Sequence, residues 1–275
     1  MKRFAPSLLL ISALPLLVGA TSQDTVLLRL KVAAGTKQKI TTTTTSLQEL
    51  SGMMERNSNT SVKSVNVFAF EPGEESKTKV VVTTEDFTIS SDQDTPGMDP
   101  AVLAEEVKSL VVTMSVDERG LVLTSESKGG GELSASITAM ESASKIGYNG
   151  IIFPEESVKI GSQWKHEVDL SSNAGEGGPL KMSGGKIPSQ FELVGFEELN
   201  GKKAAKIKIT MKGRVNVELT QGLPATGTMD LDTNGHFWID LATGLLLKAE
   251  SKVITDIDLS MIRVKSTANS KVVVE

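Results

Sequence analysis

Four residues in the second half of the chain have the spacing of a cation-binding loop. Asp230, Asp232, Asn234 and Gly235 form the pattern D-x-D-x-N-G within TMDLDTNGHFWID. Carboxylate and amide oxygens at this spacing open many calcium loops, but such a loop also needs a bidentate Glu at its twelfth position, where this chain has Leu241. The acids alternate with apolar residues as in a strand, and Asn-Gly tolerates the positive φ of a tight turn. We therefore predict a turn or a strand bulge here, with no metal ligands and no cofactor.

Acid–base catalysis is constrained by the two histidines of the chain, His166 and His236. His166 shares a predicted strand face with Trp164 and Val168, which is typical of a packed β residue, and His236 adjoins the turn predicted above. No G-x-S-x-G motif occurs, and PLKMSGGKI departs from a phosphate-binding loop at both ends. We predict no catalytic residues and no enzyme activity. A hydrolase is the less favoured alternative, because triads are recognised by geometry and not by sequence alone.

A run of basic residues marks one predicted strand of an otherwise acidic chain. Two interpretations remain open: the run binds lipid head groups or another polyanion, or it is a solvated face paired with acids across the sheet. We favour the second interpretation because charge runs are usually solvated. The run consists of Lys202, Lys203, Lys206, Lys208, Lys212 and Arg214.

The elements that would position these side chains are mainly long strands. Apolar and polar residues alternate from Ala205 to Leu219 and again from Leu245 to Met261, which predicts strands with one dry face. Such lengths suit a strongly bent sheet or barrel, with Gly213 as a bend point. The other predicted strands are Thr25 to Val32, Lys37 to Ser46, Val62 to Phe70, Lys77 to Ser90, Val112 to Val116, Leu121 to Ser125, Ser157 to Leu170 and Gln190 to Phe196.

Two segments have helical spacing. Asp99 and Pro100 offer an N-cap and a first-turn proline, so we predict a helix from Pro100 to about Leu110 that packs on the inner face of the sheet. A second short helix is predicted near residues 133–143, and residues 171–186 form a Gly-rich loop. The predicted fold is mainly β: a curved antiparallel sheet or half-barrel with two short helices.

The composition and the first residues predict an exported protein. Residues 1–20 combine Lys2 and Arg3 with an apolar stretch and small residues, as in a signal peptide. Its removal would change the formal charge from -5 to -7, which makes nucleic acid an unfavourable partner. The chain has no cysteine, so disulfides and thiol chemistry are excluded. We expect one β-rich domain over residues 21–275, soluble in the periplasm or outside the cell.

A faint internal repeat is also present. GLVLTSESK begins at Gly120 and GLLLKAESK at Gly244, an offset of 124, while GTKQK at Gly35 and GSQWK at Gly161 are offset by 126. The similar offsets indicate two similar halves, residues 21–130 and 150–260. Chance matching of common β residues is the alternative.

Three stretches resemble an uncharacterised family of exported bacterial β-rich proteins, a domain of unknown function. They are FPEESVKIGSQWKHEV, MSVDERGLVLTSES and GHFWIDLATGLLLKAES. The resemblance spans most of residues 21–275 and implies no catalytic residues. More distantly, long strands with two short helices look like the half-barrel of bacterial lipoprotein carriers, which implies a curved sheet around an apolar cavity.

These observations predict an exported, non-catalytic binding or envelope-maintenance protein that holds a lipid or other apolar ligand. The alternative is a structural or protein-interaction module with a filled core, which could have another envelope protein as its partner. A dry face of Ile, Val, Leu and Met suits either role.

Overall fold

The computed structural model describes residues 25–52, 55–74, 77–93, 99–130, 147–169, 180–183, 185–219, 225–260 and 262–275. The predicted signal peptide (residues 1–20), the second predicted helix (near residues 133–143) and most of the Gly-rich loop lie outside these residues. No helix among them is long and apolar enough to cross a membrane.

Strands dominate the described part of the chain, as predicted. The elements are β1 (Lys37–Gly52), β2 (Arg56–Pro72), β3 (Thr78–Ser91), α1 (Pro100–Ser109), β4 (Val111–Val116), β5 (Val122–Lys128), β6 (Gln163–Asp169), β7 (Leu180–Ser183), β8 (Lys186–Leu199), β9 (Lys202–Leu219), β10 (Ala225–Asp240), β11 (Leu246–Asp258) and β12 (Ile262–Val274).

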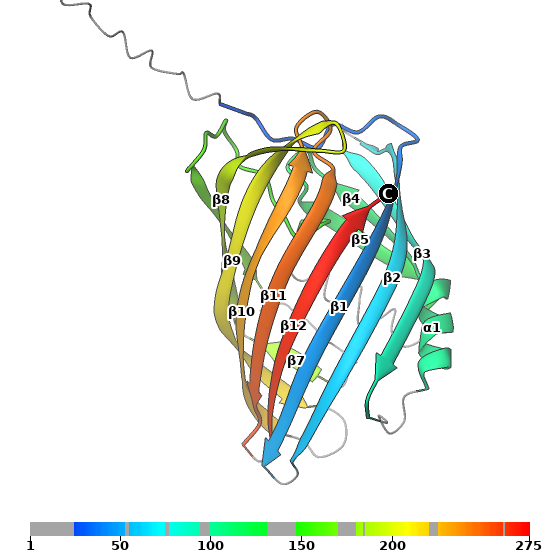
Figure 1. The fold of residues 1–275 in the computed structure, drawn as a ribbon, viewed down its shortest axis with the longest axis vertical. Coiled ribbons are helices and arrows are strands. Elements are labelled where there is room, and N and C mark those ends of the chain that lie inside the picture. The colour runs from blue at the N-terminus through cyan, green and yellow to red at the C-terminus, as the bar shows by residue number, and fades with distance from the viewer. Residues whose placement is uncertain are drawn as a thin grey trace, which may run out of the picture.

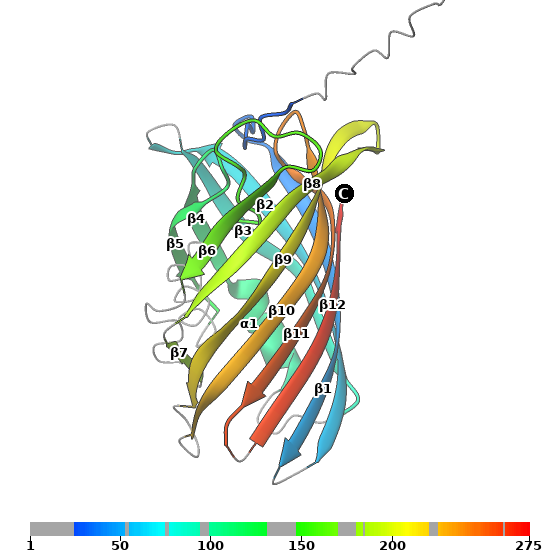
Figure 2. The same ribbon diagram turned by 90° about the vertical axis from the view of Figure 1, so that its left-hand side faces the viewer.

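One antiparallel sheet of 12 strands is built from these elements, in the order β5-β4-β3-β2-β1-β12-β11-β10-β9-β8-β6, with β7 added beside β9. The last strand, β12, pairs over its whole length with residues Ile40 to Gly52 of the first strand, β1, in the middle of the sheet. The sheet bends so that both of its edge strands lie on the side opposite β1 and β12 (Figures 1 and 2). The predicted half-barrel is therefore confirmed.

The alternation predicted for residues 205–219 separates an inner from an outer face. On β9, Ile207 and Ile209 are buried, whereas Lys208 is exposed on the other face. The main core lies at the end of the half-barrel where β12 finishes, the upper end in Figure 1. Each large aliphatic or aromatic side chain buried there contributes about 1.5–3 kcal/mol to folding. The largest side chains that are fully buried there are Phe70, Ile151, Phe153, Phe191, Leu193, Ile207 and Ile239.

A second apolar cluster lies lower on the same inner face. It contains Ile187, Val215, Val217 and Leu259, with partly buried methionines and leucines around it. Gly213 fits this cluster because an added Cβ would lie only 3.0 Å from the Ile187 side chain.

Helix α1 begins as predicted but packs differently. Asp99 caps it by accepting a hydrogen bond of 2.8 Å from the amide of Ala101, and Pro100 occupies the first turn. The helix lies beside β3 (Figure 1), and none of its residues is buried. The expectation that it packs on the inner face of the sheet is therefore wrong. A helix beside a strand covers backbone groups that a sheet edge would otherwise expose.

Two local predictions are also wrong. Asn234 and Gly235 lie in the middle of the continuous strand β10 and form neither a turn nor a bulge, because the register with β9 and β11 is unbroken there. Glycine is needed there because an added Cβ would come within 2.8 Å of the Glu250 carbonyl oxygen. The segment from Thr25 to Val32 is not a strand either, since its ladder contact is a single bridge between Val26 and Val158.

Candidate functional site

The acidic stretch that suggested a cation site lies on the outer face of β10. Asp230 accepts two hydrogen bonds of 2.7 Å from Arg214, and Asp232 lies 3.4 Å from the ammonium of Lys212. The hydrogen bonds from Arg214 hold the pKa of Asp230 below its ordinary value. Among the described residues, no group of three or more His, Cys, Asp or Glu side chains is placed to hold a metal ion. The carboxylates serve cross-strand ion pairs in this arrangement.

The basic run on β9 is matched by acids on the neighbouring strands. Lys206 lies 2.9 Å from the Glu197 carboxylate of β8, and its ammonium also lies 5.0 Å from the centre of the Trp238 ring. Lys206, Lys212 and Arg214 of the run therefore each form an ion pair with an acid on the outer face. Their partners are Glu197 of β8 and Asp230 and Asp232 of β10, the two strands beside β9. The geometry supports a solvated, paired face.

The two histidines do not share a site. His166 lies on the inner face of β6 with Trp164, which stacks on Phe191 at 5.5 Å. His236 lies on the outer face of β10, where burial and then Lys206 lower its pKa. The sheet stands between the two imidazoles, so they cannot act on one substrate.

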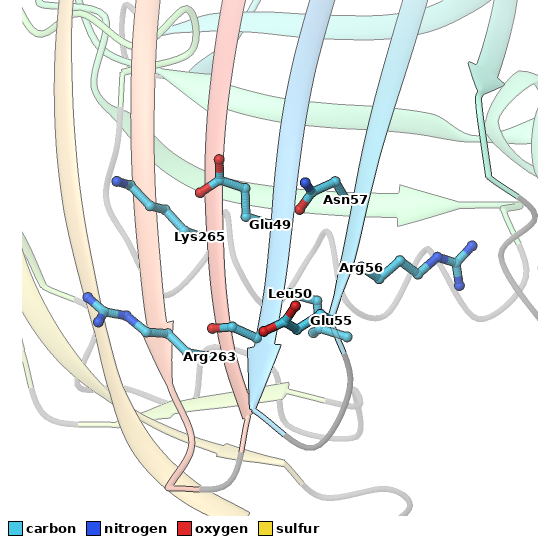
Figure 3. A pocket seen from close by; sticks show the side chains of 8 residues that line it. Glu49, Leu50, Glu55, Arg56, Asn57, Arg263 and Lys265 are labelled. Carbon is cyan, nitrogen blue, oxygen red and sulfur yellow. The ribbon is translucent and has the colours of Figure 1, made fainter.

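A mixed-charge hollow of about 490 Å³ lies at the lower end of β1, β2 and β12 (Figure 3). Its walls include Glu49, Glu55, Arg56 and Lys265, together with Arg263. Arg263 is already held at 2.8 and 2.5 Å by Asp256 of β11. The carboxylates in the wall oppose the binding of an anion, so this hollow is a weak candidate for a ligand site.

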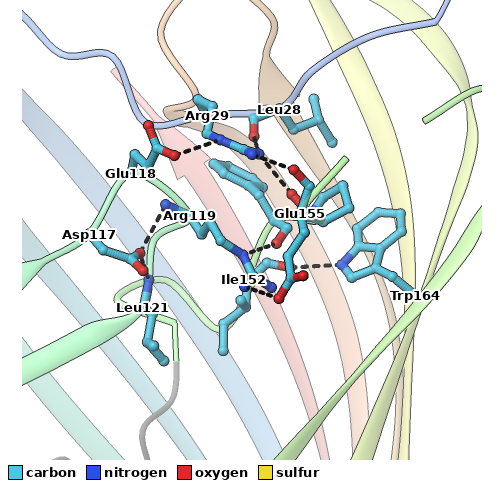
Figure 4. A network of polar contacts seen from close by, with 11 residues as sticks. Leu28, Arg29, Asp117, Glu118, Arg119, Leu121, Ile152, Glu155 and Trp164 are labelled. Carbon is cyan, nitrogen blue, oxygen red and sulfur yellow. Dashed lines mark hydrogen bonds and ion pairs between the residues drawn. The ribbon is translucent and has the colours of Figure 1, made fainter. Parts of the chain in front are cut away.

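The upper end of the half-barrel is closed by a network of arginines and carbonyl groups (Figure 4). Residues 25–34, which we call the strap, cross this end of the sheet. Arg29 of the strap is only 10% exposed and donates to the carbonyl oxygens of Leu28, Pro154 and Glu155 at 2.8, 2.7 and 2.5 Å. Its Nε also donates to Glu118 at 3.2 Å.

The turn between β4 and β5 forms the other side of this network. Asp117 accepts from the amides of Arg119 and Leu121 at 2.9 and 2.8 Å. The Arg119 side chain donates to the Phe153 carbonyl at 2.9 Å and to the Glu155 carboxylate at 2.8 Å. Both arginines join segments that are distant in sequence, which is a structural role. Sequence reasoning missed both arginines, because their partners are mostly backbone carbonyls.

Below the main core, the inner face changes character. The side chains there are small, uncharged and half-buried. Threonine, serine, alanine and valine fill less space than the Phe, Ile and Leu of the core, so the strands are lined thinly. We call this surface the inner strip. It consists of Thr42, Thr44 and Ser46 of β1, Val62 and Ser64 of β2, Ser251, Val253 and Thr255 of β11, and Ser266, Ala268 and Ser270 of β12.

Cross-strand pairing shows that the inner strip is one continuous surface. Thr44 lies opposite Ser270, and their hydroxyl oxygens are 2.6 Å apart. Ser270 in turn lies opposite Ser251 on the next strand. Because the hydroxyls of Thr44 and Ser270 bond each other, this pair presents mainly methyl and methylene surface and can contact an apolar molecule. Sequence reasoning missed the strip because β12 was not predicted as a strand.

No protein-family model and no curated protein matches the chain. Among solved structures, one of lipid–protein interactions in lipovitellin matches with a TM-score of 0.52 and 10% identity, over 88% of this chain and 25% of that chain. The chain thus spans about a quarter of the lipovitellin chain it matches, and the likeness shows the fold alone.

Two further solved structures are more distant. A DUF1329 family protein from Desulfovibrio piger has a TM-score of 0.19 and 9% identity, over 83% of each chain. A LolA superfamily protein from Nitrosomonas europaea has a TM-score of 0.12 and 8% identity, over 87% of this chain and 86% of that one. These two TM-scores are too low to support an argument about fold or function.

Proposed function

We propose that this protein is an exported, non-catalytic envelope protein that holds an apolar ligand against its inner strip. The observation that carries the proposal is the uncharged, thinly lined surface that continues from the core down β1, β11 and β12. Each methylene of a ligand that leaves water there contributes about 0.8 kcal/mol to binding. A chain of several methylenes therefore gains enough free energy to stay bound.

Two further findings support this proposal. The fold is like that of lipovitellin, whose solved structure concerns lipid–protein interactions. The absence of catalysis is supported by His166 and His236, which lie on opposite faces of the sheet.

Native mass spectrometry of protein purified from its own host, followed by organic extraction, tests the proposal. We expect one acyl-containing molecule per chain. Ala268→Trp would fill the inner strip and should abolish the bound mass, because the indole occupies the volume that the ligand needs. Asn269→Trp is the matched control, since the adjacent residue of β12 is exposed on the outer face.

The opposite result is equally clear. A ligand-free protein that also fails to take up fluorescent fatty acids or phospholipids would end the carrier proposal. A ligand retained by Ala268→Trp and lost in Asn269→Trp would move the site to the outer face.

A further inference from the structure

Two buried polar atoms lie where the inner strip meets the main core. The Tyr148 residue is 9% exposed and Gln38 is 5% exposed. The Tyr148 hydroxyl and the Gln38 Oε1 have no hydrogen-bond partner in the described part of the chain. A buried polar group left unpaired costs about 1–3 kcal/mol, so such atoms are uncommon in a folded protein unless something else bonds them.

The orientation of the Gln38 amide is fixed by its surroundings. Its Nε2 donates to the carbonyl oxygen of Leu246 in β11 at 2.5 Å. The two strands can meet here because β12, which lies between them elsewhere, ends at Val274 opposite Ile40. A carbonyl oxygen only accepts hydrogen bonds, so the amide cannot be turned over without losing this bond. Oε1 is therefore the atom of the amide that lacks a partner, and it can only accept a hydrogen bond.

Phe68 connects the two polar groups. It lies opposite Gln38 in the pairing of β1 with β2, and its ring centre is 6.5 Å from that of Tyr148 in an edge contact. Phe68 is only half-buried and packs at the margin of the core. The same inner face continues from it through Asn66 to Ser64 of the strip. A ligand that lies along the strip thus reaches Phe68 first, and Phe68 is the neighbour that Gln38 and Tyr148 share.

We propose that Tyr148 and Gln38 bind the head group of the apolar ligand, and that this head group is an uncharged hydroxyl, as in a long-chain alcohol or a monoacylglycerol. This inference rests on the proposed function. A hydroxyl accepts the O–H of Tyr148 and donates its own hydrogen to Oε1 of Gln38, which satisfies both atoms at once.

Other head groups match the two atoms less well. A carboxylate only accepts, so it would meet the Gln38 Oε1 with no hydrogen between two oxygen atoms, and it would be a buried charge. An ether can accept from Tyr148 but cannot donate to Gln38. A quaternary or phosphate head group would bring charge to a place lined by aromatic rings. The rings of Phe68 and Phe70 both make edge contacts with Tyr148, at 6.5 and 6.1 Å.

The test compares three ligands with the same alkyl chain: the alcohol, its methyl ether and the carboxylate. Each is delivered from cyclodextrin to delipidated protein, and its affinity is measured by calorimetry. We expect the alcohol to bind about tenfold more tightly than the ether, the factor that corresponds to about 1.4 kcal/mol. Tyr148→Phe should remove most of this preference and leave the affinity for the ether unchanged.

Tyr148→Phe also has a readout without ligand. If its hydroxyl is unpartnered in the protein, the variant should be as stable as the unaltered chain or more stable, so it will fold. Trp164→Phe is the control, because the Trp164 indole already donates to the Ile152 carbonyl at 2.7 Å. It should lower the melting temperature and keep the preference for the alcohol.

Each failure has a distinct meaning. If none of the three ligands binds, both the carrier function and this inference are wrong. If they bind with equal affinity, or if the carboxylate binds best, the carrier function stands and the head-group inference is overturned. A marked loss of ligand-free stability in Tyr148→Phe would show that the protein itself bonds this hydroxyl, which also overturns the inference.

Discussion

Gly244 offers a direct test of how the strap is held at the upper end of the half-barrel. Its φ is +74°, and an added Cβ would collide with the carbonyl oxygen of Arg29 and lie 2.9 Å from the Cα of Leu30. Gly35 has a similar φ of +81°, but no heavy atom lies within 4 Å of the position of its Cβ. Alanine at these two sites therefore separates the cost of backbone conformation from the cost of contact with the strap.

The expected losses differ by a wide margin. A left-handed conformation costs an L-residue about 1–2 kcal/mol, and this is the whole cost for Gly35→Ala. Gly244→Ala carries the same cost and also forces the strap away from the turn. The bond from the Lys31 amide to the Thr243 carbonyl, 2.8 Å long, would then weaken. The loss of this hydrogen bond and the poorer packing of the buried Leu30 side chain bring the total decrease in the free energy of unfolding to about 3–5 kcal/mol.

Urea unfolding of the two variants measures the difference, and trypsin locates it. At about 2–4 °C per kcal/mol for a chain of this size, Gly244→Ala should also melt well below Gly35→Ala. Trypsin should cut the strap of Gly244→Ala after Arg29 or Lys31 under native conditions, where the unaltered chain resists. Equal losses of stability, with the strap still resistant to trypsin, would refute the reasoning.

The other two predictions concern the charged outer face. Hydrogen bonds from Arg263 hold the pKa of Asp256 below its ordinary value of 3.8, so the stabilising effect is complete above that value and is lost as the pH falls through the lowered pKa. Urea midpoints measured from pH 7 downward should therefore fall more steeply for the unaltered chain than for Asp256→Asn, and parallel curves would contradict this. Calcium should leave the melting temperature unchanged because Arg214 and Lys212 already form ion pairs with Asp230 and Asp232. A decrease in melting temperature on chelation, abolished by Asp232→Ala, would restore the metal hypothesis.

The strands that the sequence predicts well are those whose pattern has a simple physical cause. Residues 205–219 alternate strictly because one face of β9 packs on the core while the other meets solvent. The observed strand begins at Lys202, and it ends at Leu219 as predicted. The predicted strand from Leu245 corresponds to β11, Leu246–Asp258. A turn at residues 241–243 precedes this strand, with Asp240 accepting a hydrogen bond from the amide of Ala242.

The failures have a common origin in contacts that are distant in sequence. Strand β12 was missed because its inner face carries Ser266, Ala268 and Ser270, which are not hydrophobic enough to produce a visible alternation. Asn234 and Gly235 have the residue types of a hairpin turn, yet long pairing with β9 and β11 outweighs that local preference. Tyr148 and Gln38 carried no motif, because what distinguishes them is burial without a partner.

The internal repeat remains a prediction, but the structure shows which observations bear on it. Both Gly35 and Gly161 have positive φ, at +81° and +85°, which turn chemistry alone would explain. The long-range bonds are more informative. The Gly35 amide donates to the Phe70 carbonyl at 2.9 Å, and the Gly161 amide donates to the Leu193 carbonyl at 2.8 Å.

The return bonds follow the same pattern. Phe70 donates from its amide to the Thr36 carbonyl at 2.9 Å, and Leu193 donates to the Ser162 carbonyl at 3.0 Å. A tight turn does not dictate which distant strand it binds, so the matching partners are evidence beyond the resemblance of the turn residues. If the two halves are alike, these bonds make β1 correspond to β6 and β2 to β8. The case for two similar halves therefore depends on these paired bonds and not on the short sequence matches that first suggested it.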